Sequence, residues 1–463
     1  MKVKIQVTIE TDQEEHLITE EVACLQRGYL TSETLGLTLA EAKEMLANLQ
    51  ETIVRHQAAE YVRQQRPCPD CGRLRSRKGT HQIVYRTLFG KLKLASPRLY
   101  TCACQPQSQK SFSPLSELLV ERTAPELRYL QTKWASLMSY GLTVKLLEDV
   151  LPIDASLTTV VRHTHQVAER LESELGEEQF MFVEGCQRDW DDLPYPDGPL
   201  TVGIDGGYVY AREGETRKAG SFEVIVGKSV PDQGAPKRFG FVNGYDQKPK
   251  RRLFELLKAQ GLQMNQAITF LSDGGDTVRN LQLYLSPLAE HILDWFHITM
   301  RLTVMKQMTH SLPIAESLQL VEPDLDRVKW CLWHGNVFKA LCRLDDIEMD
   351  LECYEQPRHS SIQKLLTKLR EFRGYIEANK AFIPNYGDRY RYGEVVSTAF
   401  VESTVNQVVS KRMVKKQQMR WTKRGAHLLL QVRTQTLNDD LGDTFCRWYP
   451  EMQVDPSASF SLN

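Results

Sequence analysis

The stretch LTVGIDGGYVYAR, residues 200–212, begins the run of segments that decides the fold of the central part of the chain. It alternates apolar with small or polar residues, as β-strands do. SFEVIVGKSV (221–230) and RFGFVNGYD (238–246) follow with the same character, and KPKRRLFELLKAQGL (248–262) has helical periodicity. Three strands followed by a helix predict an α/β domain that begins near residue 200.

The segments that follow alternate between strand and helix. AITFLSDGGD (267–276) predicts a strand ending in a turn, VRNLQLYL (278–285) a helix, and HILDWFHI (291–298) a strand that runs into another helix. An RNase H-like mixed sheet requires this order of elements. The residues beyond are almost wholly helical in pattern, over a length too great for a simple connection. We therefore predict an RNase H-like core in two parts, 200–298 and 386–436, separated by a helical insertion at 299–385.

The rest of the chain divides by composition. Residues 111–175 are helical in pattern, and YGLTVKLLEDVLPIDASLTTVVRHTHQVAERL (140–171) predicts a helix, a turn and a helix capped by Ser156. This is either a helix-turn-helix or an ordinary helical hairpin. The other predicted segments are an N-terminal strand and helices at 1–66, a basic strand-like region at 67–110, an acidic linker at 176–199 and a C-terminal tail at 437–463.

Charge is unevenly distributed, although the formal net charge of the 463-residue chain is only −1. Residues 61–110 hold eleven Lys and Arg and one acid, and residues 403–436 hold eight Lys and Arg and no acid. Two such basic blocks favour a polyanionic partner. No stretch approaches the roughly 18 apolar residues of a membrane span, and the N-terminus lacks the apolar centre of a signal peptide. We expect a cytoplasmic, nucleoid-associated protein without a membrane partner.

Four of the ten cysteines form two close pairs, Cys68 with Cys71 and Cys102 with Cys104. Thiolate pairs on two turns, joined by a basic hairpin, are typical of a zinc ribbon. The sequence therefore predicts one Zn²⁺ within residues 67–110. Two alternatives stay open: four reduced cysteines without metal, or His81 in place of one cysteine. The six cysteines without such spacing are expected in the core: Cys24, Cys186, Cys331, Cys342, Cys353 and Cys446.

Three carboxylates stand in positions that suit a metal site. Asp205 interrupts an apolar strand, where a bare carboxylate is costly unless it is paired or bound to a metal. Asp273 follows a second strand, and Glu402 lies at the edge of the apolar face of a predicted helix. Both aspartates also suit ordinary turns before glycines. Asp276 is a rival for Asp273, and Glu394 is a weaker alternative to Glu402.

Carboxylates that converge at one sheet edge would hold two Mg²⁺ ions, or Mn²⁺ ions, since magnesium prefers hard oxygen ligands. A two-metal site of this kind activates an attacking water or 3′-hydroxyl and stabilises the leaving oxygen of a phosphoryl displacement. The sequence therefore predicts phosphoryl-transfer chemistry on a nucleic acid.

The sequence resembles the transposases of bacterial insertion sequences, specifically the ISKra type of the DDE superfamily, over nearly its whole length. The resemblance is carried by GIDGG at Asp205, FLSDGGD at Asp273, DWFH at 294–297, WHGN at 333–336, the stretch after Phe400, and CPDCG with CACQ. It implies metal-dependent cleavage and strand transfer in transposition, a form of DNA recombination. It also implies the triad Asp205, Asp273 and Glu402, double-stranded DNA partners (transposon ends and target), and a homodimer or larger assembly on DNA.

One departure from the family pattern concerns the third carboxylate. Gly-Ser-Gly is expected shortly before the glutamate, whereas this chain has Val396-Ser397-Thr398. Glu402-Ser403 still matches best, and Glu394 stays open. The Asp294-to-His297 motif is similar to an acid-x-x-His signature of transposases with helical insertions. We expect an Asp294–His297 hydrogen bond to brace the site from behind the metal ligands, although a buried histidine bonded to a nearby acid would look the same.

The region after Glu402 predicts DNA contacts. Arg412, Lys416 and Arg420 recur every four residues, with Lys415 and Lys423 nearby, so that one continuing helix would present a basic face to phosphates. Trp330 or Trp333 would stack on an unpaired base, unless both belong to the helical core. Two other functions stay open: an RNase H-like endonuclease without strand transfer, and a non-enzymatic zinc-containing DNA-binding regulator.

Overall fold

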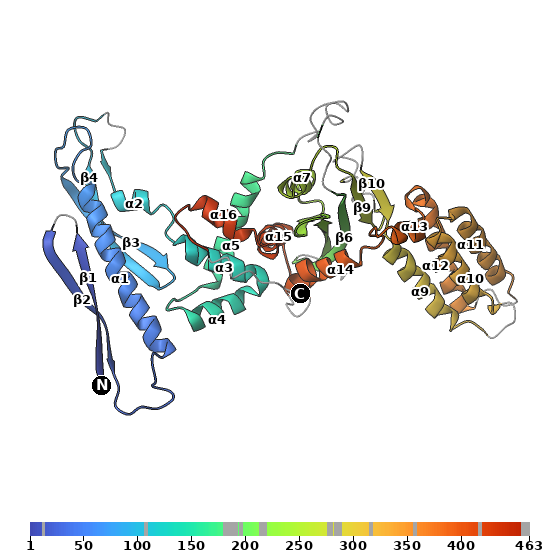
Figure 1. The fold of residues 1–463 in the computed structure, drawn as a ribbon, viewed down its shortest axis with the longest axis horizontal. Helices are drawn as coiled ribbons and strands as arrows, with labels where there is room; N and C mark the ends of the chain where they lie inside the picture. Colours follow the sequence, from blue (N-terminus) through green and yellow to red (C-terminus); the bar gives the residue numbers. More distant parts are fainter. Residues whose placement is uncertain are drawn as a thin grey trace. The chain divides into compact units, whose positions relative to one another are not determined.

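The computed structural model (Figure 1) describes residues 1–11, 14–105, 110–178, 193, 198–212, 220–275, 281, 289–313, 318–354, 359–414 and 419–454. The chain forms two compact units. The first comprises residues 1–167 and 439–463, and the second comprises residues 168–438. Both contain helices and sheets, which confirms the predicted α/β class. Most of the predicted acidic linker, 176–199, lies outside the described residues.

The first unit begins with two β-hairpins separated by a long helix. Strands β1 (Lys2–Thr11) and β2 (Glu14–Gln26) are antiparallel, and so are β3 (Arg77–Thr87) and β4 (Gly90–Tyr100). Helix α1 (Leu39–Gln64) starts at a capping box in which Thr38 and Glu41 satisfy each other's backbone N–H. The prediction of one strand and several helices in residues 1–66 was wrong, because residues 14–26 pair with β1 and only one helix follows.

Short helices complete this unit. Ser139 and Ser156 each accept a hydrogen bond from a backbone N–H three residues further on, so each caps the start of a helix, as predicted for Ser156. The predicted C-terminal tail instead contains a helix, since buried Phe445 packs edge-on against Tyr129 of α3 with ring centroids 5.3 Å apart. The elements are β5 (Ser111–Phe112), α2 (Pro114–Leu118), α3 (Pro125–Leu137), α4 (Tyr140–Val150) and α16 (Leu441–Trp448). The division between the units falls within α5 (Leu157–Glu174), after Val167.

The second unit is built on a five-stranded mixed sheet in the order β10-β9-β6-β7-β8. β6 is antiparallel to β7, and β7 to β8, whereas β6, β9 and β10 are parallel neighbours. The strands are β6 (Leu200–Tyr210), β7 (Ser221–Val230), β8 (Lys237–Val242), β9 (Ile268–Ser272) and β10 (Glu290–Leu293).

Helices cover both faces of this sheet. α7 (Pro249–Ala259) buries Leu253 and Leu257 against Val202 and Ile204 of β6. On the opposite face, α14 (Ala399–Val405) lies over β6 and β7, and α15 (Lys423–Leu437) lies over β8. The even-numbered residues of β6 are therefore its core on one side, which leaves the odd-numbered residues, Asp205 among them, on the side of α14.

A bundle of helices is inserted between β10 and α14 (Figure 1). Its members share one apolar core that includes Leu325, Leu344 and Leu366. Tyr386 is fully buried and donates its hydroxyl to the carbonyl of Leu293 at 2.7 Å, which ties the bundle to the end of β10. The helices are α9 (Trp295–Thr309), α10 (Val321–Trp333), α11 (Val337–Glu352), α12 (Ser360–Ala378) and α13 (Tyr386–Arg391).

The prediction of one continuous helix from Ala399 to Trp421 was wrong. α14 passes into a π-helix over Asn406–Val414, and Trp421 is extended and bridges to Ala211 beside β6. Arg433 of α15 donates to the carbonyls of Gln407 and Val408, so a side chain from another helix satisfies part of the altered backbone. The described part of the chain contains no helix long and apolar enough to cross a membrane.

Candidate active site and metal centre

Three aspartates lie where the parallel pairing of β6, β9 and β10 ends, two of them after their strands and Asp205 within β6. Asp273 directly follows β9 and Asp294 directly follows β10, while Asp205 stands two residues beyond the last β6 residue paired with β9. Neighbouring parallel strands end at the same edge of a sheet, where α/β proteins place their ligands. The structure therefore brings Asp205 and Asp273, 68 positions apart in the printed sequence, to one edge.

Two glycines bring α14 onto β6 at this edge. Gly203 and Gly207 flank Asp205 on the same face of the strand. A Cβ at Gly203 would collide with Val401 and Phe400, and one at Gly207 would lie 3.0 Å from Val405 Cγ1. The helix thus touches β6 on both sides of Asp205. Glu402 lies in the same turn as Val401, and its side chain is exposed.

The edge is acidic. Burial raises the pKa of Asp205, and the nearby charges of Asp273 and Asp294 raise it further, whereas the Gly206 amide and His297 lower it. Gly206 N–H donates to Asp205 Oδ1 at 2.7 Å. Asp273 accepts from the Gly275 amide at 3.1 Å, so the turn interaction considered for it is present as well. A cation bound between these carboxylates would relieve their repulsion.

Asp294 sits fully buried behind this edge and accepts four hydrogen bonds. The donors are Phe296 N–H at 2.9 Å, Thr398 N–H at 2.8 Å, the Thr398 hydroxyl, and His297 Nδ1 at 2.7 Å. Burial alone would raise the pKa of Asp294, but these donors hold it below its usual value. An ionised Asp294 requires the proton on His297 Nδ1, which leaves His297 Nε2 as the other polar atom of the ring.

The pKa of His297 is affected by all three aspartates. Burial lowers its pKa, but the hydrogen bond and charge of Asp294, followed by the charges of Asp205 and Asp273, raise it overall. The Asp294–His297 bond expected from the sequence is therefore present and belongs to the acidic edge. Of the two rival carboxylates, Glu394 is exposed and ion-paired with Arg389 at 2.8 Å, and Asp276 lies outside the described residues.

Only two groups of described residues bring three or more ligand atoms of His, Cys, Asp or Glu within 4.8 Å of one another. Asp205, Asp273 and Glu402 are not such a group. A single ion would require closer carboxylates, but ligands of two ions about 3.5–4 Å apart are spread more widely. Carboxylate oxygens are hard ligands, which Mg²⁺ and Mn²⁺ prefer.

The four predicted cysteines form one of these groups. Sγ–Sγ distances are 3.5 Å for Cys68–Cys104 and 3.4 Å for Cys71–Cys102 and Cys71–Cys104. Disulfide bonding needs about 2.05 Å, so the thiols are free. A tetrahedral metal with S ligands at about 2.3 Å requires sulfur separations of about 3.8 Å, close to those found. The four thiols thus form a preassembled metal site, and His81 is not part of the group.

The turn that carries Cys68 and Cys71 favours the thiolate form of Cys68. Gly72 adopts φ +71° and donates its N–H to the Cys68 carbonyl at 2.8 Å, which closes the turn. Burial raises the pKa of the Cys68 thiol, but the backbone amides of Cys71 and Asp70 and the sulfurs of its neighbours bring it down to about 6. Amides aimed at a sulfur favour the thiolate, which is the form that binds metals.

The second group, Glu172, Asp246 and His427, is an ion-pair network that the sequence analysis missed. Arg252 lies among them and donates Nε to Asp246 at 2.9 Å and Nη2 to Glu172 at 3.1 Å. His427 Nε2 lies 3.5 Å from Glu172. The guanidinium already supplies the positive charge that a metal would bring, so we interpret this group as a structural network that holds the end of α5. Positions 172, 246 and 427 are far apart in the sequence and share no motif, so this group could not be predicted.

The residues predicted to contact DNA differ in exposure. Arg412 is fully buried over the ring of Trp421, 5.3 Å from its centroid, so its prediction as a phosphate ligand was wrong. Arg420 and Lys423 are exposed, and Lys415 and Lys416 lie outside the described residues. Trp333 packs against Trp295 and Tyr386 in the helical core.

Trp330, by contrast, is 64% exposed. It lines a pocket of about 510 Å³ whose basic members are Arg327, Lys339 and Arg343. Of the two tryptophans considered, Trp330 is therefore the one with a face open to a ligand. Arg327 and Arg343 also contact acids of their own helices, Asp324 at 2.7 Å and Asp346 at 3.5 Å.

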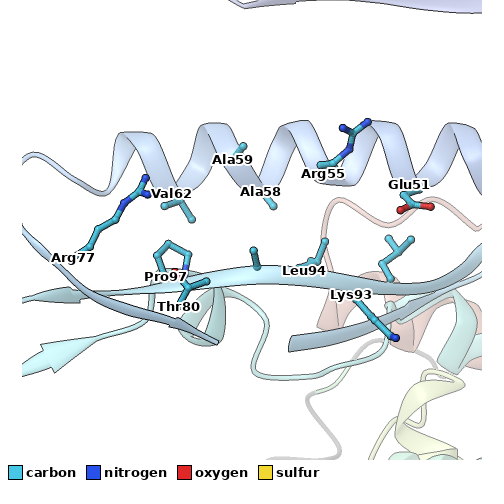
Figure 2. A pocket seen from close by; sticks show the side chains of 12 residues that line it. Glu51, Arg55, Ala58, Ala59, Val62, Arg77, Thr80, Lys93, Leu94 and Pro97 are labelled. Carbon is cyan, nitrogen blue, oxygen red and sulfur yellow. The ribbon is translucent and has the colours of Figure 1, made fainter. Parts of the chain in front are cut away.

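A groove of about 380 Å³ runs between α1 and β4 in the first unit (Figure 2). Ala58 and Val62 of the helix and Leu94 and Pro97 of the strand form its apolar floor. Arg55, Arg77, Lys93 and Glu51 also line it, but Arg55 is paired with Glu20 and the Lys93 side chain points away from α1 in Figure 2. The basic block expected from the sequence at 61–110 thus lies in part along this groove.

No protein-family model and no curated protein matches the chain. Among solved structures, it is similar to a crystal structure of NurA, with 14% identity over 55% of this chain and 74% of that chain, at a TM-score of 0.12. A crystal structure of NurA with manganese gives 16% identity over 62% and 66% of the two chains, also at 0.12. A TM-score of 0.12 does not show a shared fold. The function is therefore inferred from the residues of the site.

Proposed function

We propose that the chain is a DNA transposase of the bacterial insertion-sequence type, which cleaves DNA and joins DNA strands in a metal-dependent reaction. The observation that carries the proposal is the position of Asp205, Asp273 and Glu402. Asp273 directly follows β9, Asp205 lies in the adjacent strand β6 just past its pairing with β9, and Glu402 lies on a helix packed against the glycines on either side of Asp205. The sheet order β10-β9-β6-β7-β8 supports an RNase H-like core.

In this proposal, Asp205, Asp273 and Glu402 hold two Mg²⁺ or Mn²⁺ ions, which would activate the attacking oxygen and stabilise the leaving one. Other residues of the chain position these ligands. Asp294 fixes the start of α14 and orients His297 beside the two aspartates. Val401 and Val405 pack against Gly203 and Gly207 of β6, which would hold α14, and with it Glu402, in a fixed position on the strand. Such preorganisation keeps the ligands in reach of the metals without rearrangement.

We further propose that Cys68, Cys71, Cys102 and Cys104 bind Zn²⁺ and form a ribbon-like knuckle at the base of the β3–β4 hairpin. Four thiolates in tetrahedral reach are the donor set of a structural zinc site. The basic residues Arg77 and Lys93 of the same hairpin support contact with DNA phosphates by this unit. Arg420, Lys423 and the pocket of Trp330 are the corresponding candidates in the second unit.

The test is a strand-transfer assay with purified protein, Mg²⁺ or Mn²⁺, and DNA bearing the inverted repeats that flank the gene. Asp205→Ala, Asp273→Ala and Glu402→Ala should each abolish cleavage and joining but leave DNA binding intact. Glu394→Ala, which removes an exposed carboxylate paired with Arg389, is the matched control and should retain activity. Cleavage without joining of a pre-cleaved end would identify a nuclease instead. Binding without metal-dependent cleavage would identify a regulator.

A further inference from the structure

Strand β1 presents a long open edge. It pairs with β2 on one side, and none of the other described strands pairs with its opposite side. The strand has ten residues and contains no proline. An open edge of this length exposes a row of backbone N–H and C=O groups that favours pairing with another strand.

The two faces of β1 differ in character. The side of Val7 faces α1, because Val7 pairs with Glu20, whose carboxylate contacts Thr52 and His56 of that helix. The residues on this face are only half-buried: Val3, Ile5, Val7 and Ile9. The residues on the opposite face are exposed: Lys2, Lys4, Gln6, Thr8 and Glu10.

The sequence of β1, KVKIQVTIET, is complementary to itself in the antiparallel direction. With Gln6 opposite Gln6 of a second strand, Lys2 stands opposite Glu10 and Lys4 opposite Thr8. On the other face, Val3 then meets Ile9 and Ile5 meets Val7. Opposite charges and β-branched pairs directly across a ladder stabilise antiparallel strands. No lysine meets a lysine in this register, so the charges that would otherwise block the edge support it.

We propose that the open edge of β1 binds the same edge of a second copy of this chain. The two hairpins then form a four-stranded sheet, β2-β1-β1-β2, with a two-fold axis at Gln6. An interface of this kind is isologous and closes at two copies. The inference does not depend on the proposed DNA chemistry, since the pairing needs only the β1 edge.

The helices leave room for this pairing. α1 packs on β2 rather than on β1. Strands are spaced about 4.8 Å apart, so the two β2 strands would lie about 14 Å apart. A helix with its side chains is roughly 10–12 Å wide. The two α1 helices therefore fit on one face of the sheet and flank the half-buried side chains between them, namely Ile5 and Val7 of both copies.

Crosslinking of the full chain without DNA tests the register. In Gln6→Cys the two new thiols face each other across the axis, and mild oxidation should give a covalent dimer in high yield. Thr8→Cys is the matched control, exposed on the same face of the same strand. Its two thiols would lie about 14 Å apart, so it should give no more dimer than the wild-type chain with its native cysteines. Equal crosslinking of the two variants would overturn the proposal.

Charge exchange tests the same register without cysteine chemistry. Lys2→Glu and Glu10→Lys each place like charges opposite each other, so each should weaken the dimer at least tenfold, as measured by sedimentation at several protein concentrations. The double variant restores both pairs and should return the dissociation constant to near the wild-type value. A wild-type chain that stays monomeric, or a double variant weaker than either single one, would contradict the proposed interface.

Discussion

Thr398 donates its backbone N–H and its hydroxyl to the buried carboxylate of Asp294, 104 residues earlier in the chain. Thr398 is the residue before α14, and Glu402 follows one turn later. Because both donors meet one carboxylate, the start of the helix is fixed in position and rotation relative to the end of β10. Asp294 therefore acts as a positioning residue for the proposed third metal ligand.

The first prediction follows from this bond. Thr398→Val keeps the shape and the backbone N–H but removes the hydroxyl, so Asp294 loses one donor and the start of α14 loses one of its two hydrogen bonds to Asp294. We expect cleavage to fall about 10- to 100-fold, as for other residues that orient metal ligands, with a higher Mg²⁺ concentration needed for half-maximal activity. Thr398→Ser should remain near wild type. Ser397→Ala, next to it, is the control. A Thr398→Val enzyme with unchanged metal dependence would show that the bond is only structural.

The second prediction concerns the contact of α14 with β6. Gly203→Ala places a methyl group where Val401 and Phe400 already lie, so the helix must move away from the strand. We expect a loss of about 1–3 kcal/mol in unfolding free energy, typical of overpacking, and a larger relative loss of cleavage. The control is Gly374→Ala inside α12, where nothing lies within 4 Å of the added Cβ. Combining Gly203→Ala with Val401→Ala should restore part of both losses.

The strands of the sheet could be predicted because each contains a local pattern of apolar residues. Residues 200–212 alternate, and Asp205 stands out as the one charge in an apolar strand. The role of Thr398 could not be predicted, since its partner Asp294 lies 104 residues earlier and no sequence pattern links the two. The prediction that Arg412 contacts phosphates was wrong for a related reason. Its four-residue spacing from Lys416 and Arg420 indicates a basic face only if one helix continues, and Trp421 ends that continuity.

The third prediction concerns the metal held by the four cysteines. Purified protein should contain about one Zn²⁺ per chain, and the pair Cys68→Ser with Cys71→Ser should lose it, as measured by elemental analysis. Because a structural zinc contributes directly to folding, residues 60–110 should then become sensitive to protease. Cys24→Ser, an exposed cysteine of β2 outside the cluster, is the control. Full zinc content in the double variant would reject the assigned ligands.

The fourth prediction uses the pH dependence of the network at α5. Burial alone would raise the pKa of Glu172, but the hydrogen bond with His427 and the charge of Arg252 hold it at about 2. A lowered pKa in the folded state stabilises the protein above the unfolded pKa of about 4.5, and this stability is lost as pH falls toward 2. Glu172→Gln should therefore cost on the order of 2 kcal/mol at pH 7, and less as pH falls below about 4.5.

The comparison for that variant is Glu169→Gln, one turn earlier on the same helix. Glu169 pairs with Arg424 at the surface, where ion pairs contribute little. Its unfolding free energy should match the wild type at every pH. A Glu172→Gln protein whose deficit is independent of pH between 7 and 4 would show that lost packing, not the ionised carboxylate, accounts for its effect.

The last prediction separates two arginines that the sequence placed on one face. Arg420 is exposed and, with Lys423, is proposed to contact phosphates, whereas Arg412 is buried over Trp421. Removing both exposed cations with Arg420→Gln and Lys423→Gln should weaken DNA binding and lower the slope of log K against log salt by about 1.8, since each phosphate contact contributes about 0.9. Arg412→Met should lower the melting temperature and leave that slope unchanged. Binding measured at several salt concentrations, with unfolding followed in parallel, distinguishes the two. A reduced slope for Arg412→Met together with an unaltered melting temperature would mean that this side chain reaches the DNA after all.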